Sequence, residues 1–196
     1  MQNKCITHFV IIGNQTDIKF LHKNLQQAVN SGKTTISKVA NTFCPQWANY
    51  PHEGYFLNLS KDNPRQITFT VHSISKPEPC LWFEICSKYQ TTRCYYHSAT
   101  VQSHHYTTND LSGRYFPQRY MIVDAKGNQN PVVSHRDMFR QAARIVPISE
   151  TFDTLEAFGK TLFPHLSQIS IFDILVVDSR GKCVTPNPQL ITQYLK

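Results

Sequence analysis

The stretch Arg65–Tyr106, RQITFTVHSISKPEPCLWFEICSKYQTTRCYYHSATVQSHHY, decides the fold that we predict. In its first part, apolar side chains alternate with threonine and histidine, which is the two-residue period of a strand with one face in the core. These apolar residues are Ile67, Phe69 and Val71. Pro77 and Pro79 lack amide donors, so they end the strand and place Pro79 in the first turn of a helix.

The rest of this stretch predicts that short helix and a second strand. Four apolar residues recur at helical spacing, namely Leu81, Trp82, Ile85 and Cys86. The following strand, Arg93–His97, puts Cys94 and Tyr96 on one face and Arg93, Tyr95 and His97 on the other. We therefore expect the helix to pack on the two strands.

Upstream, the sequence predicts a strand over Cys5–Ile12, a helix capped by Thr16, an irregular insertion over residues 34–54 and a strand over Tyr55–Leu59. Within the insertion we expect a short strand near Ile36–Val39. The Tyr55 and Ile67 strands are expected to form a hairpin. The resulting order, β-α-β-β-α-β, predicts an α+β fold of the ferredoxin-like split βαβ type over residues 1–106.

This pattern resembles the ferredoxin-like proteins of unknown function that phages and conjugative plasmids carry. The resemblance covers residues 3–125 and rests on the cysteine-containing first strand, the Pro77–Pro79 corner and the strand with Cys94-Tyr95-Tyr96. The chain departs from that pattern at His104-His105-Tyr106, where the family commonly has a glycine. The resemblance implies a mobile-element context and no enzyme, and it supplies no functional residues.

Residues 107–196 form an extension that we expect to pack on the first part. After a polar link at residues 107–110, the elements expected are a strand over Tyr120–Asp124, a helix from His135 to Ile145 capped by Ser134, a helix over Phe152–Leu162, a strand over Ile169–Val177 and a terminal helix over Gln189–Leu195. Two prolines, Pro147 and Pro164, are expected to end the first two helices.

Composition favours a cytoplasmic protein with an acidic partner. The 196 residues carry a formal charge of +7 and an isoelectric point near 9.1, which favours a host protein, a ribonucleoprotein or nucleic acid as the partner. No apolar run approaches the roughly 20 residues of a membrane span. The six cysteines contain no C-x-x-C pair, so we expect reduced thiols.

The sharpest candidate site is a row of arginines on the predicted helix after Ser134. Arg136, Arg140 and Arg144 follow at four-residue spacing, which lines them up at intervals of about 6 Å, close to the phosphate spacing of a nucleic-acid strand. Further candidates nearby are Arg114, Arg119, Lys126 and the aromatic Tyr115. The spacing by itself favours a solvated helix face, with Met138, Phe139, Ala142 and Ala143 turned inward, and binding of an acidic partner is the alternative.

The sequence gives less support for metal binding, phosphate binding or catalysis. His72, His97, His104 and His105 lack the spacing of a metal-ligand pair, and no metal or cofactor is predicted. Ser31–Thr34 resembles the end of a phosphate loop but follows a helix and lacks the first glycine. No nucleophile motif is present, and Asp173 in an apolar strand is expected to have a raised pKa.

We therefore predict a non-enzymatic interaction protein of a phage or plasmid. It would bind a host macromolecule, for example to inhibit a host defence complex of the CRISPR or restriction type. The alternative is direct nucleic-acid binding by the basic helix face, and a lesser one is an enzyme with a dispersed site.

Overall fold

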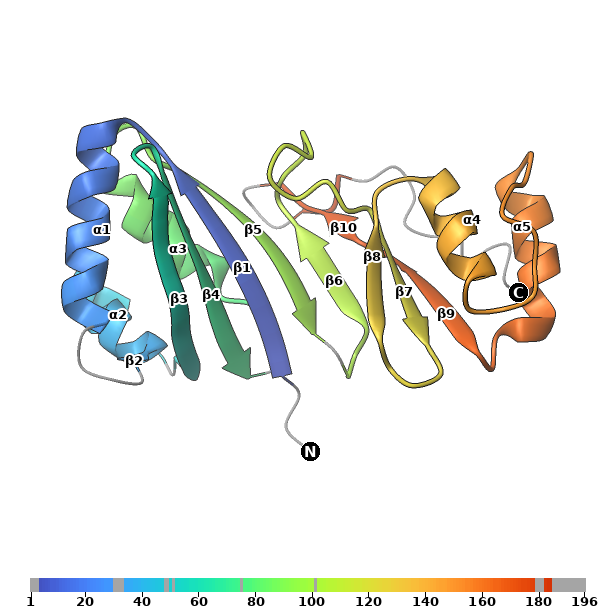
Figure 1. Cartoon of the computed structure of the whole chain (residues 1–196). Helices are drawn as coiled ribbons and strands as arrows, with labels where there is room; N and C mark the ends of the chain where they lie inside the picture. The colour runs from blue at the N-terminus through green and yellow to red at the C-terminus, as the bar shows by residue number, and fades with distance from the viewer. Residues whose placement is uncertain are drawn as a thin grey trace. The chain divides into compact units, whose positions relative to one another are not determined.

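The computed structural model describes residues 4–29, 34–47, 50, 52–74, 76–100, 102–178 and 182–184. The chain divides into two compact units, Met1–His105 and Tyr106–Lys196, each of which is described by itself (Figure 1). This division falls one residue before the boundary that we predicted. No described helix is long and apolar enough to cross a membrane.

The first unit is an antiparallel sheet with helices on one side. Its elements are β1 (Lys4–Ile12), α1 (Gln15–Val29), β2 (Thr34–Thr35), α2 (Ile36–Phe43), a 3-10 turn (Pro45–Trp47), β3 (Gly54–Asn63), β4 (Gln66–Ile74), α3 (Pro79–Ser87) and β5 (Arg93–Thr100). The strands follow one another in the order β5-β1-β4-β3-β2, and all neighbours are antiparallel. The predicted hairpin is β3 with β4 and is confirmed.

Stacked aromatic side chains form the core of this unit. Phe9 of β1 lies opposite Phe69 of β4 and Tyr96 of β5, so all three project from the same face of the sheet. Trp82 of α3 is fully buried against this face, with its ring centroid 4.5 Å from that of Phe69 and 5.3 Å from that of Phe9. The predicted packing of the helix on the two strands is confirmed.

Two predictions in the first unit are wrong. Asn14, and not Thr16, caps α1, because its Oδ1 accepts a hydrogen bond from the amide of Asp17 at 2.7 Å. The segment near Ile36–Val39 is the helix α2 instead of a strand. Thr35 caps this helix, and its apolar residues repeat with helical spacing and are buried, which outweighs the preference of β-branched residues for strands.

The second unit contains a three-stranded antiparallel sheet and two helices. Its elements are β6 (His105–Thr108), β7 (Tyr120–Asp124), β8 (Gln129–Val132), α4 (His135–Ala143), α5 (Leu155–Leu162), a 3-10 turn (Phe163–His165), β9 (Ile169–Asp173) and β10 (Leu175–Val176). The sheet order is β8-β7-β9, and β10 pairs with β6 in parallel.

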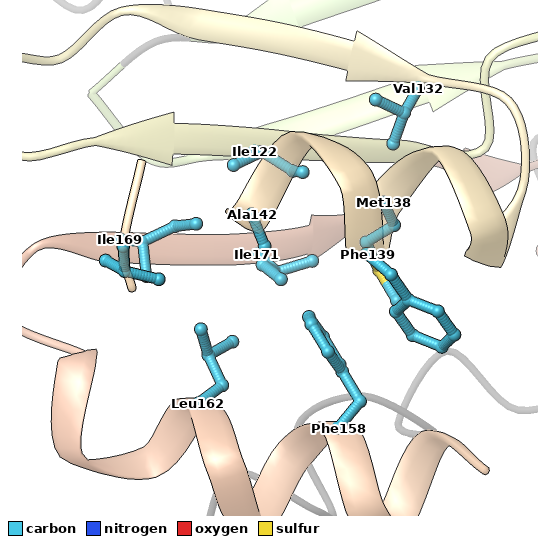
Figure 2. Close-up of a cluster of buried hydrophobic side chains, with 10 residues drawn as sticks. Ile122, Val132, Met138, Phe139, Ala142, Phe158, Leu162, Ile169 and Ile171 are labelled. Atoms are coloured by element: carbon cyan, nitrogen blue, oxygen red, sulfur yellow. The ribbon is translucent and has the colours of Figure 1, made fainter. Parts of the chain in front are cut away.

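The core of the second unit lies between this sheet and the two helices. Met138, Phe139 and Ala142 of α4 face Ile122, Ile169 and Ile171 of the strands, and α5 adds Phe158 and Leu162 (Figure 2). The ring centroids of Phe139 and Phe158 are 4.6 Å apart. Burial of this face of α4 leaves its opposite face available to solvent.

Several boundaries differ from the predictions. The expected strand Ile169–Val177 is divided into β9 and β10, because the amide of the buried Ile174 donates to the carbonyl of Arg119 and β10 pairs with another strand. The helix expected from Phe152 begins at Leu155, since Thr154 caps it. Two short strands, β6 and β8, were not predicted. The predicted helix over Gln189–Leu195 lies outside the described residues.

The prediction of a mixed α+β fold with a mostly antiparallel sheet is confirmed. The more specific split βαβ topology stays a prediction, because the first unit has five strands and that motif has four.

Candidate binding site on the arginine face of α4

The sequence around Ser134 builds α4 and thereby positions the arginines. The Ser134 hydroxyl accepts a hydrogen bond from the amide of Asp137 at 3.2 Å, and its own proton is donated to Asp137 Oδ2 at 2.6 Å. This pair stabilises the first turn. Because Met138, Phe139 and Ala142 are buried, Arg136 and Arg140 are exposed on the other face.

Arg144 follows the last residue of α4 and remains in helical conformation. Its guanidinium donates to Oε1 of Gln141 at 3.3 Å, and Arg144 lines a pocket of about 330 Å³. Lys126, from the turn between β7 and β8, lines the same pocket. The structure therefore brings together two of the predicted cations, Arg144 and Lys126, from separate elements.

Asp124 also lines this pocket, but its carboxylate has partners of its own. It accepts hydrogen bonds from the side chain and the amide of Asn128 and from the amide of Lys126, at 2.7, 2.9 and 2.9 Å. The hydrogen bonds from Asn128 are the main reason why the pKa of Asp124 is lowered. The carboxylate stays ionised and tied to the turn, and it forms no ion pair with Arg144 among the described residues.

Arg119 has a structural role in the loop that leads to β7. Its guanidinium donates to the carbonyls of Phe116, Gln118 and Asp110 at 2.8, 2.9 and 3.1 Å. Because these contacts use its donors within the loop, we leave Arg119 out of the proposed site. Arg114 is exposed, with its guanidinium carbon 5.6 Å from the centroid of the half-buried Tyr115 ring.

The same loop contains a buried carboxylate that sequence reasoning missed. Asp110 is fully buried, and it accepts hydrogen bonds from the amides of Gly113, Tyr115 and Phe116 and from the hydroxyl of Ser112. Burial alone raises the pKa of Asp110, but these four donors outweigh that effect and lower it. The only sequence signal was Asp110 followed by Gly113, whose φ of +69° suits a tight turn.

A second group of polar side chains lies where β7 begins and β9 ends. The Tyr120 hydroxyl and Nε2 of His135 are 2.6 Å apart, and Tyr120 pairs with Asp173 across β7 and β9. Burial raises the pKa of Asp173 to about 6, which confirms the predicted direction. Burial and the nearby Asp173 also raise the pKa of Tyr120. Among the described residues, no nucleophilic side chain is found hydrogen-bonded to this group.

The predicted histidines do not assemble into one group. His104 and His105 are exposed in and after a turn, whereas His97 lies in β5 with its pKa lowered to about 4 by burial and by His8. Among the described residues, no three His, Cys, Asp or Glu side chains lie close enough together to hold a metal ion.

Comparison of the chain with family models, curated proteins and solved structures gave no match. The resemblance to phage and plasmid proteins therefore remains an expectation from the sequence.

Proposed function

We propose that this protein binds an acidic macromolecule without chemical turnover, and that the arginine face of α4 makes the contact. The observation that carries the proposal is the exposure of Arg136, Arg140 and Arg144 without a carboxylate partner. The ion pairs found among the described residues join His52 to Glu78 and Lys160 to Glu156, so the arginines are not neutralised by an acid there.

The arrangement supports recognition of a surface that carries regularly spaced negative charge. Arginine donates several hydrogen bonds in a planar fork, which suits carboxylates and phosphates. Lys126 extends the positive surface at the Arg144 end, and Arg114 with Tyr115 supplies a second exposed contact. A host protein or ribonucleoprotein is the partner that we propose, as in the inhibition of a host defence complex, and nucleic acid is the alternative.

The fold proposal has separate support. Within the first unit, β5-β1-β4-β3 are antiparallel neighbours in the order that the split βαβ motif requires of its four strands. We propose that this unit is a ferredoxin-like domain that carries β2 and α2 as an insertion. The phage or plasmid context is part of the proposal only through the sequence resemblance.

The test is binding of the full chain to two polyanions, heparin and a DNA duplex, at two salt concentrations. Replacing Arg136, Arg140 and Arg144 with Glu is expected to lower affinity at least tenfold at low salt, because three favourable contacts become repulsive. The matched control replaces the same three residues with Lys, which keeps the charge and should retain most of the binding. Unchanged binding by the Glu variant would remove the arginine face from the proposal.

A further inference from the structure

The first unit, and not the arginine helix, holds most of the excess positive charge. Residues 1–105 contain 10 Lys and Arg against 5 Asp and Glu, whereas residues 106–196 contain 10 against 8. The question is therefore where the first unit presents this charge.

The strand registers define a face of the sheet that points away from α1, α2 and α3. Cross-strand partners share a face, so His8 lies on the same side as Thr70 and His97, and Val10 on the same side as Thr68 and Tyr95. We call this set the open face. Its members are Lys4, Ile6, His8, Val10, Ile12, Tyr55, Leu57, Gln66, Thr68, Thr70, His72, Ile74, Arg93, Tyr95, His97 and Ala99.

Among the side chains that the structure describes, the open face has no acidic member. The acids of the first unit whose side chains are described belong to other segments: Asp17 bonds to Thr91 beside α1, Glu78 and Glu84 belong to α3 and its start, and Glu53 precedes β3 and lines a pocket at one end of the face. In contrast, the cations Lys4 and Arg93 of the open face are exposed. Two cations on a face without a described carboxylate favour a negatively charged ligand.

The open face also has groups that suit the bases of a nucleic acid. Tyr55 is 47% exposed, and Tyr95 is half-buried on the same face as apolar Ile6 and Ile12. Aromatic and imidazole rings on a sheet stack with unpaired bases, and neighbouring cations contact the phosphates. A duplex hides its bases, so a sheet face with stacking groups fits a single strand better than a double helix.

A pocket of about 450 Å³ opens at one end of this face. Lys4, Tyr55 and His72 line it from the open face, and Thr35 and Ser37 line it from the start of α2. The acidic Glu53, from the segment before β3, also lines it, so we expect the base and sugar of a nucleotide to enter the pocket and its phosphate to stay near Lys4. This volume falls within the usual range for a small-molecule site. The pocket is therefore large enough for one nucleotide. Gly54 is needed here, because a Cβ at this position would lie 2.0 Å from the carbonyl oxygen of His72.

One wall of the pocket is held rigidly by the buried His52. Its Nε2 donates to the carbonyl of Trp47 at 3.1 Å, and its Nδ1 lies 2.5 Å from Oε2 of Glu78. The hydroxyl of Ser37 donates to the carbonyl of His52 at 2.6 Å. These contacts join the segment before β3 to the starts of α2 and α3, so the pocket is formed before any ligand binds.

From the cations and rings of the open face, where no described side chain is acidic, and from the pocket at its end, we infer that the first unit binds single-stranded nucleic acid, with one nucleotide in the pocket. Lys4 and Arg93, at opposite ends of the face, contact the phosphates, and Tyr95 stacks on a base. This inference does not depend on the arginine face of α4, which belongs to the other unit.

The test is fluorescence anisotropy of the full chain with a labelled 12-nucleotide RNA, the DNA strand of the same sequence and its DNA duplex, at two salt concentrations. We expect the single strands to bind at least tenfold more tightly than the duplex, with binding weakened by salt. Replacing Lys4 and Arg93 with Glu is expected to reduce single-strand binding at least tenfold, and Tyr95→Ala several-fold.

The matched control replaces Lys19 and Lys23 with Glu, because both are exposed on α1 and this variant has the same change in net charge. Equal losses in the two double variants would overturn the inference, since the effect would then follow from net charge. Equal affinity for strand and duplex, or no binding at low salt, would overturn it as well. Loss of binding in the α4 Glu variant alone would support the arginine proposal and contradict this one.

Discussion

The two units bury titratable groups of opposite kinds. In the first unit, burial and the nearby His8 lower the pKa of His97 to about 4, so the fold favours the neutral imidazole. In the second unit, burial raises the pKa of Asp173 to about 6, so the fold favours the neutral carboxyl. Acid is therefore expected to weaken the first unit and to relieve a cost in the second. The contributions of these two groups to the pH dependence of stability therefore have opposite signs, which the net charge of the chain does not predict.

The cores differ as well, and the largest expected effect is in the first unit. Trp82 contacts Phe9, Phe56 and Phe69, and its indole Nε1 is buried with no hydrogen-bond partner found. Trp82→Ala is expected to lower the free energy of unfolding by about 3–5 kcal/mol. Trp82→Phe should cost far less, since it keeps an aromatic ring and removes an unsatisfied donor.

Urea denaturation measures both Trp82 variants, and hydrogen exchange of the β4 amides assigns the loss to the first unit. Phe20→Ala is the control, because Phe20 is 56% exposed on α1 and should change stability by less than about 0.5 kcal/mol. A Trp82→Phe variant as unstable as Trp82→Ala would show that the shape of the indole, and not aromatic packing alone, holds this core.

The next effect is the loss of stability in the first unit on acidification. The pKa of His97 is about 4 in the folded chain and 6.5 in an unfolded one, so the unfolded state takes up the proton first. Stability is complete above pH 6.5 and decreases as the pH falls toward 4. At pH 4.5 the expected loss is about 2–3 kcal/mol.

Hydrogen exchange of β5 at pH 7 and pH 4.5 measures this loss. A His97→Asn variant should show a flatter response, because it has no proton to gain at that position. The same acid sensitivity in the variant would assign the response to other groups, and the comparison between the units would lose its basis.

In the second unit, the contribution of Asp173 to stability changes with pH in the opposite direction. Asp173 has a folded pKa of about 6 against 3.8 when unfolded, so its burial costs stability as the pH rises from about 4 to 6. Asp173→Asn is expected to stabilise this unit by about 1–3 kcal/mol at pH 7, the lower end allowing for its partial exposure. At pH 3.5 the gain should disappear.

Thermal unfolding at the two pH values checks this gain, with hydrogen exchange of β7 to assign it. Asp153→Asn is a control, because Asp153 is exposed in the segment before α5. Destabilisation by Asp173→Asn at pH 7 would mean that the carboxylate makes a favourable contact that its raised pKa does not reveal.

Local patterns in the sequence predicted those elements whose signals lie within a few residues. The alternation from Ile67 to Val71, the proline at position 79 and the cap at Ser134 all correspond to element types that the structure contains. The pairing of distant strands has no such signal. β8 contains Pro131 and yet pairs with β7, and the apolar run after Ile169 changes its partner at Ile174.

The two candidate sites also differ in whether a local sequence pattern reveals them. The arginine spacing on α4 could be read from Arg136, Arg140 and Arg144 alone. The open face could not, because His8 and His97 are 89 positions apart in the sequence and become neighbours only through the register of β1 and β5. The role of Arg119 was also hidden, since its acceptors are backbone carbonyls of the surrounding loop.

The smallest expected effect concerns the starts of the helices in the two units. α3 begins with Pro79 and has no side-chain cap, whereas α4 depends on the Ser134 hydroxyl. Ser134→Ala should therefore cost about 1 kcal/mol, whereas Ser134→Asp, which retains an acceptor, should cost much less. Urea denaturation measures the difference. Because the cap orders the turn that carries Arg136, the Ala variant should also weaken polyanion binding slightly. If the variant loses the expected stability and its binding is unchanged, Arg136 does not take part in the proposed contact.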